Sequence, residues 1–110
     1  MSLVNRQEAM ERLGDDEELF AEICDLFCRD VPEMLTAMQS GLAAGDLHQV
    51  VRSAHSIKSA SSSIGAEQLS ELARCAEDAG RAGDVAGIQN LVAPLEVAVE
   101  SVMKELQSPT

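Results

Sequence analysis

The sequence has almost no aromatic residues. Phe20 and Phe27 are the only two in 110 residues, and Trp and Tyr are absent. Hydrophobic residues still make up 45 % of the chain, which is enough for the core of one domain, while the length is too short for two. A core without aromatic bulk must be aliphatic and rich in alanine, and this composition suits closely packed helices better than a sheet. We therefore expect residues 1–110 to form a single domain.

Basic residues are also scarce. The chain has 8 Lys and Arg against 19 Asp and Glu, for a net charge of -11, and this argues against a nucleic-acid partner, whose backbone requires a basic face. No stretch approaches the ~18 apolar residues of a membrane span, and the N-terminus lacks a basic region followed by an apolar run. We expect a soluble, cytoplasmic protein without membrane insertion. We assign the first three residues no structural role.

Cysteine is limited to Cys24, Cys28 and Cys75. Cys24 and Cys28 lie four positions apart in an apolar helical pattern, so they cannot easily form a disulfide along one helix. Buried thiols in a reducing compartment account for all three. A zinc site would need two more ligands at a suitable spacing, and the sequence offers none. We therefore predict no metal site.

Turn signals divide the chain into helical segments. Three Gly-Asp pairs, at 14–15, 45–46 and 83–84, place a residue that tolerates a left-handed helix end before a good N-cap, and Gly65-Ala66 makes a fourth break. Between the breaks the apolar residues recur with a helical period, and none alternate with period two. Because the links are short, neighbouring helices must run antiparallel. The sequence predicts an all-α, up-down-up-down four-helix bundle over residues 16–107, with a short additional helix near Asn5 to Leu13.

Two prolines fall inside the long periodic segments. Pro94 lies opposite the apolar stripe of its segment, and Pro32 lies to the side of its own stripe. A proline on the outer face removes a hydrogen bond and bends a helix around its core without emptying that core. We therefore expect two bent helices rather than broken ones.

One histidine stands out in the segment SAHSIKSASSSIGA, residues 53–66. At about 100° per residue, His55 lies roughly 120° from the centre of the apolar stripe of its helix. Lys58 lies on the shoulder of that stripe, where its stem can cover apolar surface while the amine stays free. Ser59 and Ser62 follow His55 on the same side of the helix. His55 is therefore predicted to be exposed.

Every residue from Ser59 to Ser63 is Ser or Ala. Serine is a mediocre helix former because it competes for backbone hydrogen bonds. A helix that accepts this cost gains small side chains that allow another surface to approach. That surface could belong to a partner, or to a neighbouring helix inside the bundle. An exposed histidine taken alone is more often a passive surface residue, and His48 is interpreted in that way.

The chemistry of imidazole fits the exposed position of His55. An imidazole has an ordinary pKa of ~6.5, so near neutral pH much of it is uncharged and nucleophilic, and it can attack a phosphoryl group directly. Lys58, one turn away, could assist a negative phosphoryl group by charge-assisted hydrogen bonding. The chain has no Gly-rich phosphate loop, and no carboxylates are arranged around His55 to hold Mg²⁺. The metal and much of the catalysis would have to come from a partner.

The segment AHSIKSASSSIGA resembles the H-x-x-K-G…G signature of histidine-containing phosphotransfer (HPt) domains, and the resemblance extends from about Asp16 to Leu106. It implies a four-helix bundle whose histidine takes a phosphoryl group from the aspartate of a receiver domain and passes it to another. The acceptor would be His55, the assisting lysine Lys58 and the downstream glycine Gly65. The family usually has glycine after the lysine. Here that position is Ser59, whose added bulk suggests looser or partner-selective docking.

The resemblance also implies the partners of the domain. These are response-regulator receiver domains, with a sensor histidine kinase as a further candidate. The resemblance implies Mg²⁺ held by the receiver and no cofactor on this chain. The docking surface would include Arg52, Ser59, Ser62 and Gly65. Such a domain carries phosphoryl groups and is not an enzyme, whether it stands alone or belongs to a larger hybrid kinase.

Three alternatives remain beside this interpretation. The N-terminal phosphotransfer domain of chemotaxis-type histidine kinases shares AHSIK and the bundle. A helical interaction module could use the Ser-rich face without phosphoryl chemistry. A metal-dependent hydrolase built on His48 and His55 is disfavoured, because seven residues along a helix span ~10 Å, too far for one ion.

Overall fold

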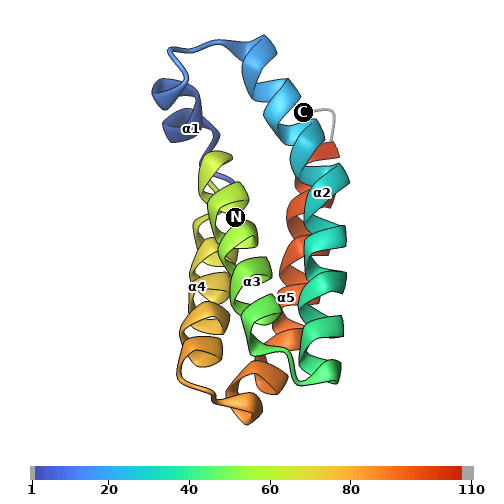
Figure 1. The fold of residues 1–110 in the computed structure, drawn as a ribbon. Coiled ribbons are helices and arrows are strands. Elements are labelled where there is room, and N and C mark those ends of the chain that lie inside the picture. The colour runs from blue at the N-terminus through green and yellow to red at the C-terminus, as the bar shows by residue number, and fades with distance from the viewer. Residues whose placement is uncertain (1, 108–110) are drawn as a thin grey trace.

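The computed structural model describes residues 2–107 and contains five helices. They are α1 (Arg6–Arg12), α2 (Glu17–Ala44), α3 (Leu47–Ser63), α4 (Glu67–Arg81) and α5 (Val85–Gln107). Helices α2 to α5 run alternately up and down as a bundle, and α1 lies at the end where α3 turns into α4 (Figure 1). No strand occurs in the described part of the chain. The predicted all-α four-helix bundle with a short leading helix is confirmed.

The helix ends follow the predicted turn chemistry, with one shift. Gly45 ends α2 with φ +72°, a left-handed conformation that costs glycine little. Asp46 then begins α3 by accepting a hydrogen bond from the backbone N–H of Gln49 at 3.1 Å. At the first Gly-Asp pair, the cap of α2 is Asp16, which accepts from the N–H of Leu19 at 3.0 Å. Asp15, the residue that the pattern indicated, instead has φ +59°.

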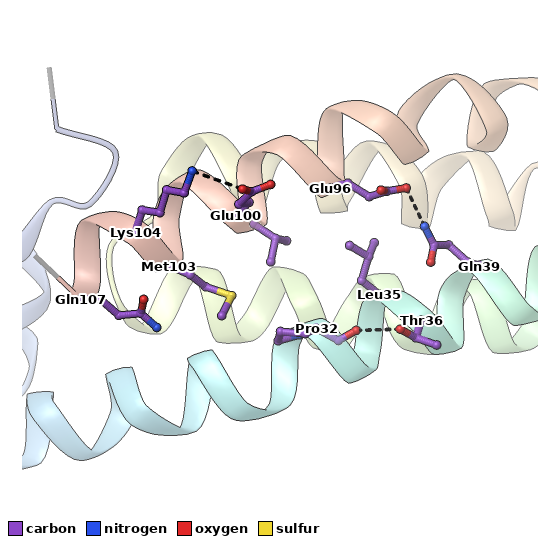
Figure 2. Close-up of a pocket in the computed structure, with 10 residues that line it drawn as sticks. Pro32, Leu35, Thr36, Gln39, Glu96, Glu100, Met103, Lys104 and Gln107 are labelled. Atoms are coloured by element: carbon purple, nitrogen blue, oxygen red, sulfur yellow. Dashed lines mark hydrogen bonds and ion pairs between the residues drawn. The ribbon is translucent and has the colours of Figure 1, made fainter.

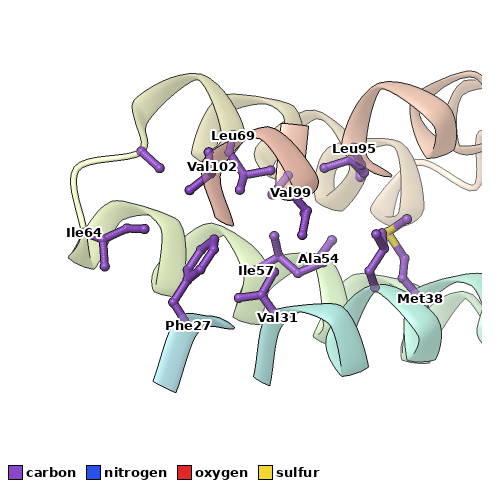
Figure 3. Packing of buried hydrophobic residues seen from close by; sticks show 14 of the residues in the cluster. Phe27, Val31, Met38, Ala54, Ile57, Ile64, Leu69, Leu95, Val99 and Val102 are labelled. Carbon is purple, nitrogen blue, oxygen red and sulfur yellow. The ribbon is translucent and has the colours of Figure 1, made fainter. Parts of the chain in front are cut away.

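The core is aliphatic and contains both phenylalanines. Figure 3 shows side chains from four different helices pointing into the core, among them Phe27, Ile57, Leu69 and Leu95. Small residues, among them Ala54, Ala73 and Ala76, are also fully buried in this core. Burial of this apolar surface is the main stabilising contribution to the bundle. The lack of aromatic bulk is thus met by close helix packing, as predicted.

Both prolines lie within continuous helices. Pro94 is exposed and Pro32 is half-buried beside the stripe of α2, so the expected placement of each is confirmed. Figure 2 shows the groove between α2 and α5 that Pro32, Leu35 and Met103 help to line. The side chain of Gln39 bridges this groove by donating to Glu96 at 2.7 Å.

Helix α5 is the one described helix that is long and apolar enough, by length and composition alone, to cross a membrane. The sequence prediction gave no such segment. In the structure, Ile88, Leu95 and Val99 of α5 are buried in the bundle core. The charged residues Glu96 and Glu100 lie on its exposed side. The buried side of α5 is apolar, while its outer side mixes these charged residues with the exposed Val97, as expected for a helix that packs one side into a bundle core.

The N-terminal segment is part of the fold, which corrects the expectation that it has no structural role. The backbone N–H groups of Leu3 and Val4 donate to the Glu105 carboxylate at 2.8 and 2.9 Å, and the Ser2 hydroxyl donates to it at 2.8 Å. Burial raises the pKa of Glu105, but these hydrogen bonds outweigh it and leave the pKa below its ordinary value. Val4 is buried. The segment is therefore held to the end of α5.

Candidate functional site

His55 lies on α3 with its side chain 55 % exposed, and Lys58 lies one turn further with its side chain 30 % exposed. Both placements agree with the helical pattern, which put His55 outside the apolar stripe and Lys58 on its shoulder. Arg52, Ser59 and Ser62 are also exposed. The outer face of α3 thus presents a histidine with a lysine beside it.

A buried carboxylate from the neighbouring helix joins these two residues. Glu77 of α4 has a side chain only 4 % exposed. Its Oε2 lies 3.0 Å from Nδ1 of His55, and its Oε1 accepts a hydrogen bond from Nζ of Lys58 at 2.8 Å. The guanidinium of Arg81, one turn along α4, donates to Oε2 at 2.6 Å. One carboxylate therefore holds three nitrogen-bearing side chains.

The ionisation of Glu77 follows from these contacts. Hydrogen bonds from Lys58 and then from Arg81 lower its pKa to about 2, against the opposing effect of burial, and the bond to His55 contributes further. Glu77 is thus a carboxylate at neutral pH, and a carboxylate only accepts hydrogen bonds. Nδ1 of His55 must therefore carry the proton. In the neutral imidazole, the lone pair then resides on Nε2.

Small residues bring α4 close enough to α3 for this contact. A Cβ atom on Gly80 would lie 2.8 Å from the Val51 side chain, so only glycine allows this approach one turn from Glu77. At the other end of the helix pair, the hydroxyls of Ser62 and Ser70 are 2.8 Å apart. The register of the two antiparallel helices thus sets Glu77 opposite His55.

The Ser-rich segment contains both residues that pack against the bundle and residues that are exposed. Ser61 is buried and donates to the carbonyl of Ile57 at 2.6 Å, and Ser62 contacts α4. Ser61 thus belongs to helix packing, whereas Ser62 makes its contact while staying exposed. Ser59 and Ser63 are exposed, and the Ser63 hydroxyl donates to the Ser59 carbonyl at 2.9 Å. Ser59, Ser62 and Ser63 are therefore the exposed serines of this segment.

Gly65 is not on the exposed surface where a docking residue was expected. It is buried, with φ +77°, and its carbonyl accepts the N–H of Asn5 at 2.8 Å. A Cβ atom there would lie 2.5 Å from the Asn5 carbonyl oxygen. The close approach of the N-terminal segment therefore explains this glycine. The sequence could not reveal this, because Asn5 is far away along the chain.

Glu77 and Arg81 were missed by the sequence reasoning, although one signal was present. The buried stripe of α4 includes Leu69, Ala73 and Gly80, and Glu77 lies on the same side of the helix. A carboxylate within an apolar stripe requires a compensating cation. That rule would have identified Glu77 as unusual, but its partners on α3 depend on the helix register.

The remaining reactive side chains do not add to the site. Burial, and to a smaller extent the nearby Cys28 thiol, raises the pKa of Cys24 to about 11. The Cys24 thiol is therefore a poor nucleophile at neutral pH. Cys75 is partly buried. Within residues 2–107, no three His, Cys, Asp or Glu side chains gather in a way that could hold a metal ion.

Comparison with known proteins identifies the family. The Hpt domain family matches residues 22–108, which include His55, Lys58 and Glu77. The crystal structure of histidine-containing phosphotransfer protein B (HptB) from Pseudomonas aeruginosa PAO1 superposes with a TM-score of 0.87 at 24 % identity, over 94 % of this chain and 90 % of that one. Among curated proteins no significant match was found. Hpt domains are phosphoryl-carrying modules of two-component signalling, and this chain belongs to the Hpt domain family.

Proposed function

We propose that His55 accepts a phosphoryl group from the aspartyl phosphate of a receiver domain and passes it to the aspartate of another receiver. The observation that carries this proposal is the hydrogen bond between Nδ1 of His55 and the ionised Glu77. It fixes the proton on Nδ1, orients an exposed ring and leaves Nε2 as the nucleophile.

The transfer step balances on these atoms. The Nε2 lone pair attacks the phosphorus of the aspartyl phosphate, a bond between Nε2 and phosphorus forms, and the bond from phosphorus to the aspartate oxygen breaks. The aspartate leaves as a carboxylate. The proton stays on Nδ1, so the ring acquires positive charge as the bond forms, and Glu77 stabilises that charge. In the reverse direction, a second aspartate attacks phosphorus and Nε2 leaves with its electron pair.

Lys58 supports the proposal through its position. It lies one turn from His55 and is partly exposed, so its ammonium group can reach a phosphoryl group on the same helix face. Arg52, Ser59 and Ser62 surround His55 on α3 and form the proposed docking surface. Gly65 is left out because it is buried.

The remaining requirements fall to the partner. Phosphoryl transfer depends on positioning and on neutralising charge at the transferred oxygens, usually with a metal ion. We propose that the receiver supplies Mg²⁺, that this domain carries the group without kinase activity, and that it works in the cytoplasm with receivers or a sensor histidine kinase.

A transfer assay tests the proposal. Wild-type protein is incubated with a panel of phosphorylated receiver domains, and labelled phosphate on this chain is followed together with its loss in acid and survival in base. His55→Gln should take up no label. His48→Gln is the matched control, because it removes the only other histidine from the same helix, and it should be labelled like the wild type.

The possible results separate the alternatives. Acid-labile label on the wild type and on His48→Gln, with none on His55→Gln, supports His55 as the phosphoryl carrier. Label that persists in His55→Gln would refute the assignment. Receivers that bind without transferring label would instead favour an interaction module.

A further inference from the structure

Of the three site residues His55, Lys58 and Glu77, Arg81 pairs with Glu77. Its guanidinium is 2.6 Å from Oε2 of Glu77, the same oxygen that faces His55, whereas Lys58 contacts Oε1. The side chain of Arg81 is 63 % exposed, in contrast to the 4 % exposure of Glu77. The buried carboxylate thus has two cationic partners, one on each oxygen and one from each helix.

Once His55 carries a phosphoryl group, two negative groups attract the ammonium group of Lys58. Before transfer its ammonium group is bonded to Glu77. Afterwards a group with up to two negative charges lies one turn away and attracts the same ammonium group. A buried carboxylate that loses its cation is strongly disfavoured. Lys58 can therefore turn to the phosphoryl group only if another cation remains on Glu77.

We propose that Arg81 is a positioning residue that holds Glu77 when Lys58 moves to the phosphoryl group. This role rests on the proposed function of His55 and Lys58. Arg81 lies one turn from Glu77 on the same helix, so its contact with the carboxylate does not depend on the position of Lys58. With Arg81 in place, Glu77 keeps a charged partner and keeps the Nδ1 proton of His55 in position.

A double-mutant cycle between Arg81 and Lys58 tests this role. The variants are Arg81→Gln, Lys58→Gln and the double variant, and the readout is the rate at which each is labelled by one phosphorylated receiver. We expect each single change to slow labelling by about tenfold, the effect of losing one charge-assisted hydrogen bond. In the Arg81→Gln background, removing Lys58 should cost clearly more than about tenfold, because the buried Glu77 carboxylate is then left without any cation.

Arg74→Gln is the matched control. Arg74 lies on the same helix and pairs with Asp78 at 2.6 Å and with Glu71, so its loss removes one positive charge without touching Glu77. It should be labelled at the wild-type rate. Arg81→Lys retains a cation at the position and should restore most of the rate lost in Arg81→Gln.

The outcomes distinguish this role from the proposed function. If Arg81→Gln is labelled as fast as the wild type, or if Lys58→Gln slows both backgrounds equally, the role of Arg81 is refuted while His55 remains the carrier. An equal loss in Arg74→Gln would also refute it, since it would show a general charge effect. A wild type that no receiver labels would overturn the proposed function and this role with it.

Discussion

Replacing Glu77 with glutamine should remove a pH-dependent part of the stability of the bundle. The pKa of this carboxyl is about 2 in the folded protein, against an ordinary value of 4.5 for a glutamate side chain. A group whose pKa is lower in the folded state stabilises the protein above its unfolded pKa, and this contribution declines as the pH falls toward the folded pKa. The stabilisation by Glu77 is therefore complete at neutral pH and is lost between about pH 5 and about pH 2.

The size of the effect follows from the two pKa values. Their difference corresponds to about 3 kcal/mol of unfolding free energy, and partial solvent screening of the exposed His55 and Arg81 lowers this to about 2 kcal/mol. Rather more than half of it should be lost on going from about pH 7 to about pH 3, because the carboxyl of the unfolded chain is largely protonated at the lower pH.

Urea unfolding at a series of pH values measures this contribution. The chain has no Trp or Tyr, so unfolding is followed by far-ultraviolet circular dichroism, which reports the loss of helix. Other carboxylates titrate in the same range, and they contribute equally to the wild type and to Glu77→Gln. The difference between the two proteins therefore isolates Glu77. It should be about 2 kcal/mol near neutral pH and should shrink by more than half at about pH 3. Parallel stability curves for the two proteins would refute the reasoning.

Four further changes give predictions, three on stability and one on the rate of labelling. Gly65→Ala should destabilise the fold by about 2 kcal/mol, because φ is +77° and a Cβ atom would lie 2.5 Å from the Asn5 carbonyl oxygen; an unchanged melting temperature would contradict this packing. Ile57→Ala removes a fully buried side chain and should cost about 2–5 kcal/mol in urea unfolding, and a loss well below that range would count against the core assignment. His55→Gln should cost less than about 1 kcal/mol, since His55 is exposed, and a large fall in melting temperature would contradict its placement. Lys58→Ala should slow labelling by a receiver without abolishing it, and an unchanged rate would remove Lys58 from the mechanism.

Local information accounts for much of the fold. Helix ends depend on residues within one turn, such as Gly45 and Asp46, and could therefore be predicted from short patterns. The face of a side chain on its own helix depends only on the helical period. The exposure of His55 and the intermediate position of Lys58 could be predicted for that reason.

Contacts between distant segments were beyond such reasoning. The Glu105 carboxylate accepts hydrogen bonds from Leu3 and Val4 and so joins the two ends of the described chain. The backbone of Asn5 packs against Gly65, so this expected docking residue is buried. Neither contact leaves a periodic signal in the sequence, because each depends on how the segments are arranged around the bundle.

The sequence by itself thus determined four amphipathic helices and one exposed histidine with a lysine beside it. Only the tertiary structure determined which group fixes the proton of that histidine on Nδ1. Helix α4 packs against α3 in a register set by Gly80 and its small neighbours, and this places Glu77 against His55. The physical reason is that helical period fixes which way a residue faces on its own helix. The partner it meets depends on the close packing of two helices.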